Sequence, residues 1–256
     1  MKFRLFTLVA LLTVGLLSIC SCSDPNEKRF TVGFDPDGKP FSFVENGKYC
    51  GFDLDLAREV EKRNNWQIVF KKIDWETKDA ELNTGSIDCL WSSFTIDGRE
   101  NDYAWTRPYM QNYIVVIVKS DSKIKNLADL AGKNVALQIE TTAQQVLGRK
   151  GARRDVGNSL RKMILTSNTE DAVADLDSGV ADAVVLDHEV AKEKISTGKY
   201  RILPEPLVAE KYGVGFAKDN TSLRDAVQKT LDEMLSDGTA AKISREYFGY
   251  DVLISK

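Results

Sequence analysis

The chain has 256 residues, of which 43% are hydrophobic, and it carries a formal net charge of −3. This composition excludes an intrinsically disordered chain, because such chains combine few apolar residues with a high net charge. It also argues against a nucleic-acid-binding protein, because no cluster of lysine and arginine offsets the acidic balance. The length beyond an export signal, about 230 residues, fits either two domains or one large one.

The first 22 residues have the organisation of an export signal. Two basic residues precede an apolar run over 5–17, and the segment Ile19-Cys20-Ser21-Cys22 follows. An apolar run of about 13 residues is short of the roughly 20 that a permanent transmembrane helix needs. We therefore expect residues 1–22 to direct the protein out of the cytoplasm, to the periplasmic or cell-surface face of a membrane.

The cysteines at the end of this signal have the character of a bacterial lipobox. Cys22 fits the acylated position better than Cys20, because the small Ser21 precedes it. Several acyl chains, palmitate among them, would anchor the protein firmly, whereas one chain alone binds a membrane only marginally. Residues 23–28 then form a polar tether. Cys50 and Cys89 are the remaining cysteines, and an exported compartment permits but does not require a disulfide between them.

In the first half of the mature chain, short apolar strands alternate with amphipathic helices. The expected strands are 30–34, 66–73, 87–91 and 113–119, and the expected helices are 53–64 and 78–83. Asp53 and Asp55 enter the first turn of the helix over 53–64, where negative charge is favoured. Strands separated by helices predict parallel sheet order and an α/β architecture.

The same rhythm restarts after residue 119. A helical turn is expected at 127–132. Further strands are expected at 134–138, 181–187 and 213–217. Further helices are expected at 142–148, at 169–179 and from Ser222 to Gly238. Ser222 and Asp225 have the spacing of a capping box, and Gly238 is a typical helix end. The sequence therefore predicts two similar α/β blocks followed by a late return segment.

Several motifs, in a fixed order, resemble those of a known family. They are Gly51-Phe52-Asp53-Leu54-Asp55-Leu56-Ala57 and the segments 82–88, 92–100, 105–109, 140–143, 182–187, 237–239 and 247–251. Over about 29–251 the chain is thus similar to the bacterial extracellular solute-binding proteins, family 3, which deliver polar amino acids to ABC importers. The resemblance implies a type II periplasmic-binding-protein fold, with two α/β lobes, two crossover segments and a ligand cleft. Lobe 1 would comprise 29–110 and 212–256, and lobe 2 would comprise 111–211.

The resemblance also implies how an α-amino acid is held. Arg99 would bind the ligand carboxylate with its planar fork of donors. Thr141 and Thr142 would add hydroxyl and N–H groups at a predicted helix start. Asp187, at the end of a strand, would pair with the ligand ammonium group, because buried charges must be paired. Helix capping by one of the threonines remains open.

The remaining predicted contacts come from lobe 1. Ser93 and Thr95 would add acceptor oxygens for the ammonium group. Asp35 aligns with a carboxylate that holds polar or basic side chains in some members, although it could also be a turn residue before Pro36. Trp75 aligns with an apolar position beside the ligand side chain, and a plain core role is the alternative.

Three departures from the family pattern affect the side-chain pocket. The spacing from Thr95 to Arg99 is one residue shorter than usual, Glu140 stands where many relatives have glycine, and Gly38 replaces an aromatic residue. None of these changes affects the residues that we expect to bind the α-amino and α-carboxyl groups of the ligand. The identity of the bound amino acid is therefore not predicted beyond a polar, and possibly basic, side chain.

The predicted function is a monomeric, lipid-anchored amino-acid-binding protein that serves a membrane permease, without a metal or cofactor. A sensor or chemotaxis adaptor would use the same cleft, so the sequence does not separate the two. An enzyme is the third reading, since some members of the superfamily are exported dehydratases. It would have to depend on His188, the only histidine, and no Gly-x-Ser-x-Gly nucleophile motif accompanies it.

Overall fold

The computed structural model describes residues 28–254. The predicted signal peptide, the predicted acylation site Cys22 and most of the predicted tether lie outside this range. Lys28, the last residue of the predicted tether, is instead the first residue of strand β1 (Lys28–Phe34). Within the described residues, no helix has both the length and the apolar character that crossing a bilayer requires.

Lobe 1 is built on a five-stranded sheet with the order β5-β1-β6-β14-β7. Its other strands are β5 (Trp66–Lys72), β6 (Cys89–Leu90), β7 (Ala104–Trp105) and β14 (Gly215–Phe216). The helices are α1 (Phe52–Asn64), α2 (Lys78–Asn83), α7 (Thr221–Ser236) and α8 (Thr239–Phe248), with a 3-10 turn at Trp75–Thr77. A small sheet adds β2 (Asp37–Gly38), β3 (Ser42–Glu45) and β4 (Lys48–Cys50).

Lobe 2 is built on a sheet with the order β10-β9-β11-β8-β12, and β13 also pairs with β8. The strands are β8 (Met110–Lys119), β9 (Asn134–Gln138), β10 (Lys162–Thr166), β11 (Ala183–Asp187), β12 (Tyr200–Ile202) and β13 (Val208–Tyr212). The helices are α3 (Thr142–Leu147), α4 (Arg154–Ser159), α5 (Thr169–Ser178) and α6 (His188–Ile195), with a capped 3-10 turn at Leu127–Leu130.

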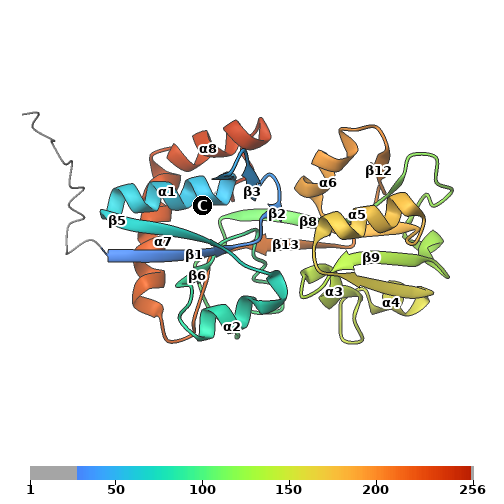
Figure 1. The fold of residues 1–256 in the computed structure, drawn as a ribbon, viewed down its shortest axis with the longest axis horizontal. Coiled ribbons are helices and arrows are strands. Elements are labelled where there is room, and N and C mark those ends of the chain that lie inside the picture. Colours follow the sequence, from blue (N-terminus) through green and yellow to red (C-terminus); the bar gives the residue numbers. More distant parts are fainter. Residues whose placement is uncertain (1–27, 255–256) are drawn as a thin grey trace, which may run out of the picture.

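Two antiparallel strands connect the lobes. β8 and β13 pair from Met110 opposite Tyr212 to Ile114 opposite Val208, and they cross together from one lobe to the other (Figure 1). The lobe 1 end of this ribbon is fixed by isolated bridges from Tyr212 to Thr95 and from Met110 to Leu253. The ribbon is therefore the structural link on which the relative position of the two lobes depends.

The sheets are mixed, whereas the sequence predicted parallel order. β5, β1 and β6 are parallel in lobe 1, and β10, β9 and β11 are parallel in lobe 2. β14 runs antiparallel to β6 and β7, and β8 runs antiparallel to β11, β12 and β13. The reason is the path of the chain, which leaves lobe 1 along β8 and returns along β13 into β14, so these strands run against the βα units.

Two helix predictions are corrected in the C-terminal segment. The capping box at Ser222 is wrong, because α7 already begins at Thr221 after Asn220, and no side chain caps it. Gly238 follows the end of α7 and, in left-handed conformation, starts α8, which the sequence analysis did not predict as a helix. The amphipathic pattern itself is confirmed, since Leu223, Val227 and Leu231 are buried. Cys50 and Cys89 are both unpaired thiols.

Candidate ligand-binding site

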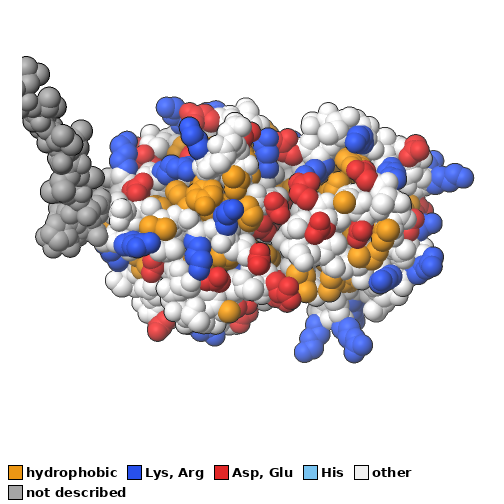
Figure 2. Space-filling view, viewed as in Figure 1, with side chains coloured by type: hydrophobic (Ala, Val, Ile, Leu, Met, Phe, Trp, Pro, Cys, Tyr) orange, Lys and Arg blue, Asp and Glu red, His pale blue; other side chains and the backbone are white. Residues whose placement is uncertain are grey.

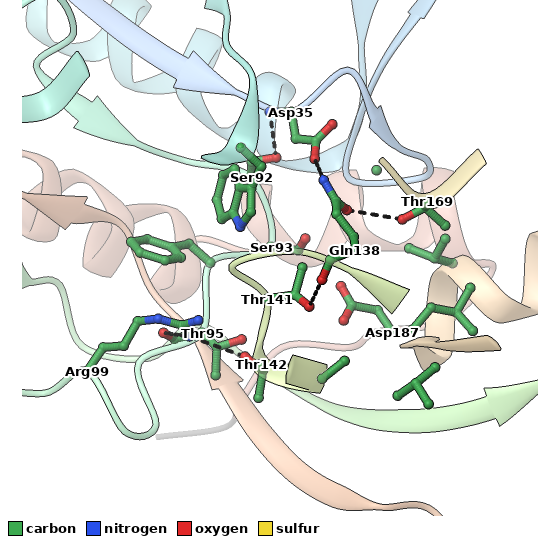
Figure 3. Close-up of a pocket in the computed structure, with 17 residues that line it drawn as sticks. Asp35, Ser92, Ser93, Thr95, Arg99, Gln138, Thr141, Thr142, Thr169 and Asp187 are labelled. Atoms are coloured by element: carbon green, nitrogen blue, oxygen red, sulfur yellow. Dashed lines mark hydrogen bonds between the residues drawn. The ribbon is translucent and has the colours of Figure 1, made fainter. Parts of the chain in front are cut away.

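A cavity lies between the lobes and encloses about 640 Å³ of space, part of it open to solvent. Its position between two lobes is that expected of a small-molecule site. All eight residues predicted to contact a ligand line it (Figure 3), and they are Asp35, Trp75, Ser93, Thr95, Arg99, Thr141, Thr142 and Asp187. The structure thus brings together residues from both lobes that are up to 152 positions apart in the sequence.

Arg99 projects from the loop between β6 and β7. Its guanidinium lies over the ring of Phe94 and donates to the Thr142 hydroxyl and to the backbone oxygen of Glu140, each at 3.2 Å. Burial lowers the pKa of Arg99, although the group stays charged in any protein environment. Among the described residues no carboxylate forms an ion pair with it, so its charge is available to an anionic ligand group.

Asp187 ends β11 and occupies the N-cap position of α6, but its side chain does not cap the helix. The carboxylate is turned into the cavity (Figure 3). Burial, and then the charge of Glu210, raise the pKa of Asp187 well above its ordinary value. The neighbouring His188 lies outside the cavity lining, with its Nδ1 2.9 Å from Glu189.

Glu210 is a buried carboxylate that the sequence analysis missed. It lies on the crossover strand β13, is 1% exposed, and accepts hydrogen bonds from Thr95 Oγ1 at 2.6 Å and Asn112 Nδ2 at 2.8 Å. Burial raises its pKa as well. The alternation of Val208, Glu210 and Tyr212 could have placed its side chain on the inner face of a strand.

The loop that carries Ser93 is held in place from α1. Ser93 has a left-handed backbone, with φ 43°, and its N–H donates to Asp53 Oδ2 at 2.6 Å. Tyr109 donates to the other oxygen of the same carboxylate at 2.8 Å. Asp53 and Asp55 lie in the first turn of α1 as predicted, but the carboxylate of Asp53 bonds to the binding loop rather than capping the helix. Neither residue lines the cavity.

The threonine pair lies at the lobe 2 side of the cavity. Thr141 occupies the N-cap position of α3, yet its hydroxyl donates to the backbone oxygen of Gln138 at 2.7 Å and does not cap the helix. Thr142 presents its hydroxyl to Arg99. Neither hydroxyl is therefore committed to capping. Glu140, just before the pair, has φ 61° and receives Lys78 from lobe 1 at 3.2 Å.

Asp35 and Trp75 line the lobe 1 side of the cavity. Asp35 Oδ1 accepts from the N–H of Asp37 at 2.9 Å, which is the turn role, and its Oδ2 accepts from Gln138 of lobe 2 at 2.7 Å. Burial raises the pKa of Asp35. Trp75 is buried edge-on against Phe94, at 5.3 Å between ring centroids.

Gln138 is a further lining residue that the sequence analysis missed. It ends β9 as Asp187 ends β11, and it also lies within hydrogen-bond distance of Thr169. Because β9 and β11 are parallel neighbours, their carboxyl ends meet at one edge of the sheet. That rule, applied to every strand of lobe 2, would have found Gln138.

The chain matches the family model described as "Bacterial extracellular solute-binding proteins, family 3" over residues 30–250. The chain belongs to this family. It is 31% identical to the probable amino-acid-binding protein YxeM of Bacillus subtilis, across 100% of this chain and 99% of that protein. It is 30% identical to the histidine-binding periplasmic protein of Salmonella typhimurium, across 88% and 89% of the two chains.

Solved structures show the same likeness in three dimensions. The ABC-transporter substrate-binding protein of Streptococcus pneumoniae, with bound histidine, has a TM-score of 0.84 and 27% identity over 89% of this chain and 95% of that one. The arginine-, lysine- and histidine-binding protein ArtJ of Geobacillus stearothermophilus has a TM-score of 0.79 and 30% identity over 88% and 96%. The predicted type II fold of this extracellular solute-binding family is thereby confirmed.

In this family member the two lobes touch across the cleft. Besides the contact between Asp35 and Gln138, an ion pair joins Lys39 to Glu193 at 2.9 Å, and Tyr250 donates to Glu189 at 2.8 Å. Figure 2 shows acidic side chains gathered along the boundary between the lobes. Burial, and then the nearby charge of Glu170 from lobe 2, raise the pKa of Asp37. The boundary thus has a negative potential that favours cationic groups.

Proposed function

We propose that this solute-binding protein captures a free α-amino acid and presents it to the permease of an ABC importer. One observation carries the proposal: among the described residues, Arg99 lines the cavity without an ion pair to a carboxylate, and Asp187 lines it without an ion pair to a lysine or arginine. Charges buried in this way are costly unless a ligand pairs them. A zwitterion supplies both missing charges.

The ligand would lie between these two poles. Its carboxylate would accept a forked pair of hydrogen bonds from Arg99, which now donates to Thr142 and to backbone oxygen. Its ammonium group would bind Asp187, assisted by the Ser93 and Thr95 hydroxyls. Thr95 donates its hydrogen to Glu210, so its lone pairs are free to accept from the ammonium group. Thr141 completes the lining.

The side chain of the ligand would extend toward Asp35 and Trp75. A buried carboxylate beside an aromatic ring suits a polar side chain, and the acidic boundary of the cleft favours a basic one. The similar protein of Streptococcus pneumoniae holds bound histidine, and ArtJ of Geobacillus stearothermophilus is an arginine-, lysine- and histidine-binding protein. L-Arginine is accordingly the first candidate ligand.

Capture would proceed by closure of the lobes about β8 and β13. Residues 29–110 with 212–256 would move as one body and residues 111–211 as the other, with the hinge at the ribbon between them. Arg99 and Ser93 of lobe 1 would meet the ligand first, and Thr142 and Asp187 would close over it. The closed monomer is the form that the permease would recognise.

Isothermal titration calorimetry against the twenty amino acids and cystine tests the proposal. We expect one class of amino acid to bind, and Arg99→Ala to weaken that binding by more than about 100-fold, since truncating one partner of a buried charge pair costs about 3 kcal/mol. Arg107→Ala is the matched control, because Arg107 is exposed and pairs with Asp232 away from the cleft. Binding within threefold of wild type in Arg99→Ala would reject the site.

We propose in addition that Cys22 carries the lipid anchor. Growth with an alkyne analogue of palmitate, followed by membrane fractionation, tests this proposal. Cys22→Ala should lose the label and release the protein from the membrane fraction, whereas Cys20→Ala should retain both, because the small Ser21 precedes Cys22 alone. If the label persists in Cys22→Ala but is lost in Cys20→Ala, the lipid is attached to Cys20 and the proposal for Cys22 is rejected.

A further inference from the structure

Tyr250 extends from the C-terminal end of lobe 1 to a helix of lobe 2. It follows α8, which ends at Gly249 in left-handed conformation. The Ser244 hydroxyl fixes the backbone of this turn, because it donates to the backbone oxygen of Tyr250 at 3.1 Å and accepts from the N–H of Val252 at 2.9 Å. Ser244 is fully buried, so lobe 1 itself determines where Tyr250 lies.

The hydroxyl of Tyr250 lies between two charged side chains of α6, the helix of lobe 2 that faces α8 across the lobe boundary (Figure 1). Lys192 Nζ donates to this hydroxyl at 2.9 Å, and the hydroxyl donates to Glu189 Oε1 at 2.8 Å. Lys192 also pairs with Glu189 Oε2 at 3.1 Å and lies 4.5 Å from the centroid of the Tyr250 ring. The three side chains together form what we call the Tyr250–α6 contact.

Burial distinguishes this contact from the other ion pair that α6 makes with lobe 1. The side chains of Lys39 and Glu193 are 50% and 38% exposed, and ion pairs between exposed groups contribute little. The side chain of Glu189 is only 7% exposed. A hydrogen bond to a carboxylate that water hardly reaches is stronger, and its loss leaves part of the carboxylate without a donor.

The first turn of α6 belongs both to the ligand site and to the Tyr250–α6 contact. Asp187, at the N-cap, and Val190 line the cavity, whereas Glu189 lies between them in sequence and binds Tyr250. Residues in one helical turn keep fixed relative positions, because backbone hydrogen bonds hold them. A movement of lobe 2 that brings Asp187 to a ligand therefore moves Glu189 as well.

We propose that the Tyr250–α6 contact is a latch that holds the cleft closed around a captured amino acid and sets how long the amino acid stays bound. Tyr250 and Glu189 are positioning residues in this role, because neither lines the cavity. The latch acts on release, since a ligand enters the open cleft before the contact forms. It depends on the proposed function, because it requires capture to close the lobes.

The rate of ligand release tests the latch. Radiolabelled L-arginine, or the amino acid of the panel that calorimetry shows to bind in its place, is chased with an excess of the unlabelled compound. Tyr250→Phe keeps the ring beside Lys192 and removes only the hydroxyl. We expect release to become about tenfold faster, as for the loss of one hydrogen bond to a charged group, with the association rate within twofold of wild type.

Tyr200→Phe is the matched control. Tyr200 donates to Asp177 Oδ1 at 2.6 Å, which is a bond of the same kind, but both residues belong to lobe 2. This variant should lower the unfolding free energy and leave the release rate within twofold of wild type. Circular dichroism of both variants confirms that they are folded before the rates are compared.

Glu189→Gln tests whether the contact acts as one unit. The amide keeps the size of the side chain and removes the charge that strengthens the bond from Tyr250. If the latch is correct, the double variant Tyr250→Phe/Glu189→Gln releases its amino acid at most about twofold faster than Tyr250→Phe alone. If the fold-changes of the two single variants multiply instead, Glu189 acts through His188 and Lys192 of its own helix, and the latch is rejected.

The outcomes separate the latch from the proposed function. If no amino acid of the panel binds wild type, the proposed function fails and the latch fails with it. If an amino acid binds and Tyr250→Phe releases it within threefold of the wild-type rate, the function stands and the latch is rejected. Equally fast release from Tyr200→Phe would also reject it, because a bond within one lobe would then have the same effect.

Discussion

The two lobes present their ligand-facing groups in different ways. In lobe 1, Ser93, Thr95 and Arg99 lie on the loop between β6 and β7, and the Asp53 carboxylate, from a distant helix, holds that loop at Ser93. In lobe 2 they lie where regular elements end or begin, with Gln138 at the end of β9, Thr142 at the start of α3 and Asp187 at the end of β11. Lobe 1 thus depends on long-range contacts, and lobe 2 depends on its sheet.

This difference has consequences for how the site fails. A change far from the cavity can disorder the lobe 1 loop, because the residues that hold it are distant in sequence. In lobe 2 the residues that line the cavity stay in place as long as the sheet is intact. The lobe 2 side of the site is therefore lost only when these residues themselves are changed. Substitutions in the two lobes therefore separate loss of structure from loss of contact.

A large loss of stability is expected for Gly51→Ala, at the N-cap of α1 in lobe 1. Gly51 has φ 134°, and an added Cβ would lie 2.1 Å from the backbone oxygen of Phe41. We expect a loss of about 3 kcal/mol or more in unfolding free energy, measured with urea, because both strain and a backbone clash must be relieved. Gly47→Ala, with φ 74° and open space, should cost only about 1 kcal/mol. If the two variants lose the same unfolding free energy, the turn at Gly51 has no special requirement for glycine.

In lobe 2, Asp187→Asn should affect binding and leave stability nearly unchanged. The amide cannot pair with an ammonium group, so we expect affinity to fall by about 100-fold or more, with the unfolding midpoint within a few degrees of wild type. A collapse of the unfolding midpoint would show that Asp187 supports the lobe 2 fold as well as the ligand.

The sequence was sufficient to predict the cavity-lining residues at the ends of elements, such as Asp187, and the motif residues of the β6–β7 loop. Arg99 and Asp187 could be predicted from the motifs, because charged groups there fit the charges of an amino acid. For Glu210, the alternation of Val208, Glu210 and Tyr212 indicates which face of a strand the side chain takes, but only the pairing of β13 with β8 shows that this face is inside. The strands β8 and β14 were predicted, but their antiparallel direction was not, because it depends on the path of the chain between the lobes.

The role of Asp53 in lobe 1 can be measured through pH. Burial raises its pKa from 3.8 to about 7, so the folded protein binds a proton that the unfolded chain releases between these values. The contribution of this carboxyl to stability is therefore complete below about pH 4 and is lost as pH rises to about 7, a change of about 4 kcal/mol. Asp53→Asn should flatten the unfolding free energy over this range. If the unfolding free energy of Asp53→Asn depends on pH as steeply as that of wild type, other buried carboxyls cause the pH dependence.

The smallest effect is expected at the contact between the lobes that Lys78 and Glu140 form at 3.2 Å. Glu140→Gln and Glu140→Gly both remove this ion pair, which is half-exposed on the Glu140 side, so each should weaken ligand affinity by only about fivefold. The two variants should differ in stability, because Glu140 has φ 61° and only glycine relieves that strain, by about 1 kcal/mol. Thermal unfolding should therefore place Glu140→Gly above Glu140→Gln at equal affinity. If affinity is unchanged in both, the contact forms when the lobes close but does not stabilise the closed state.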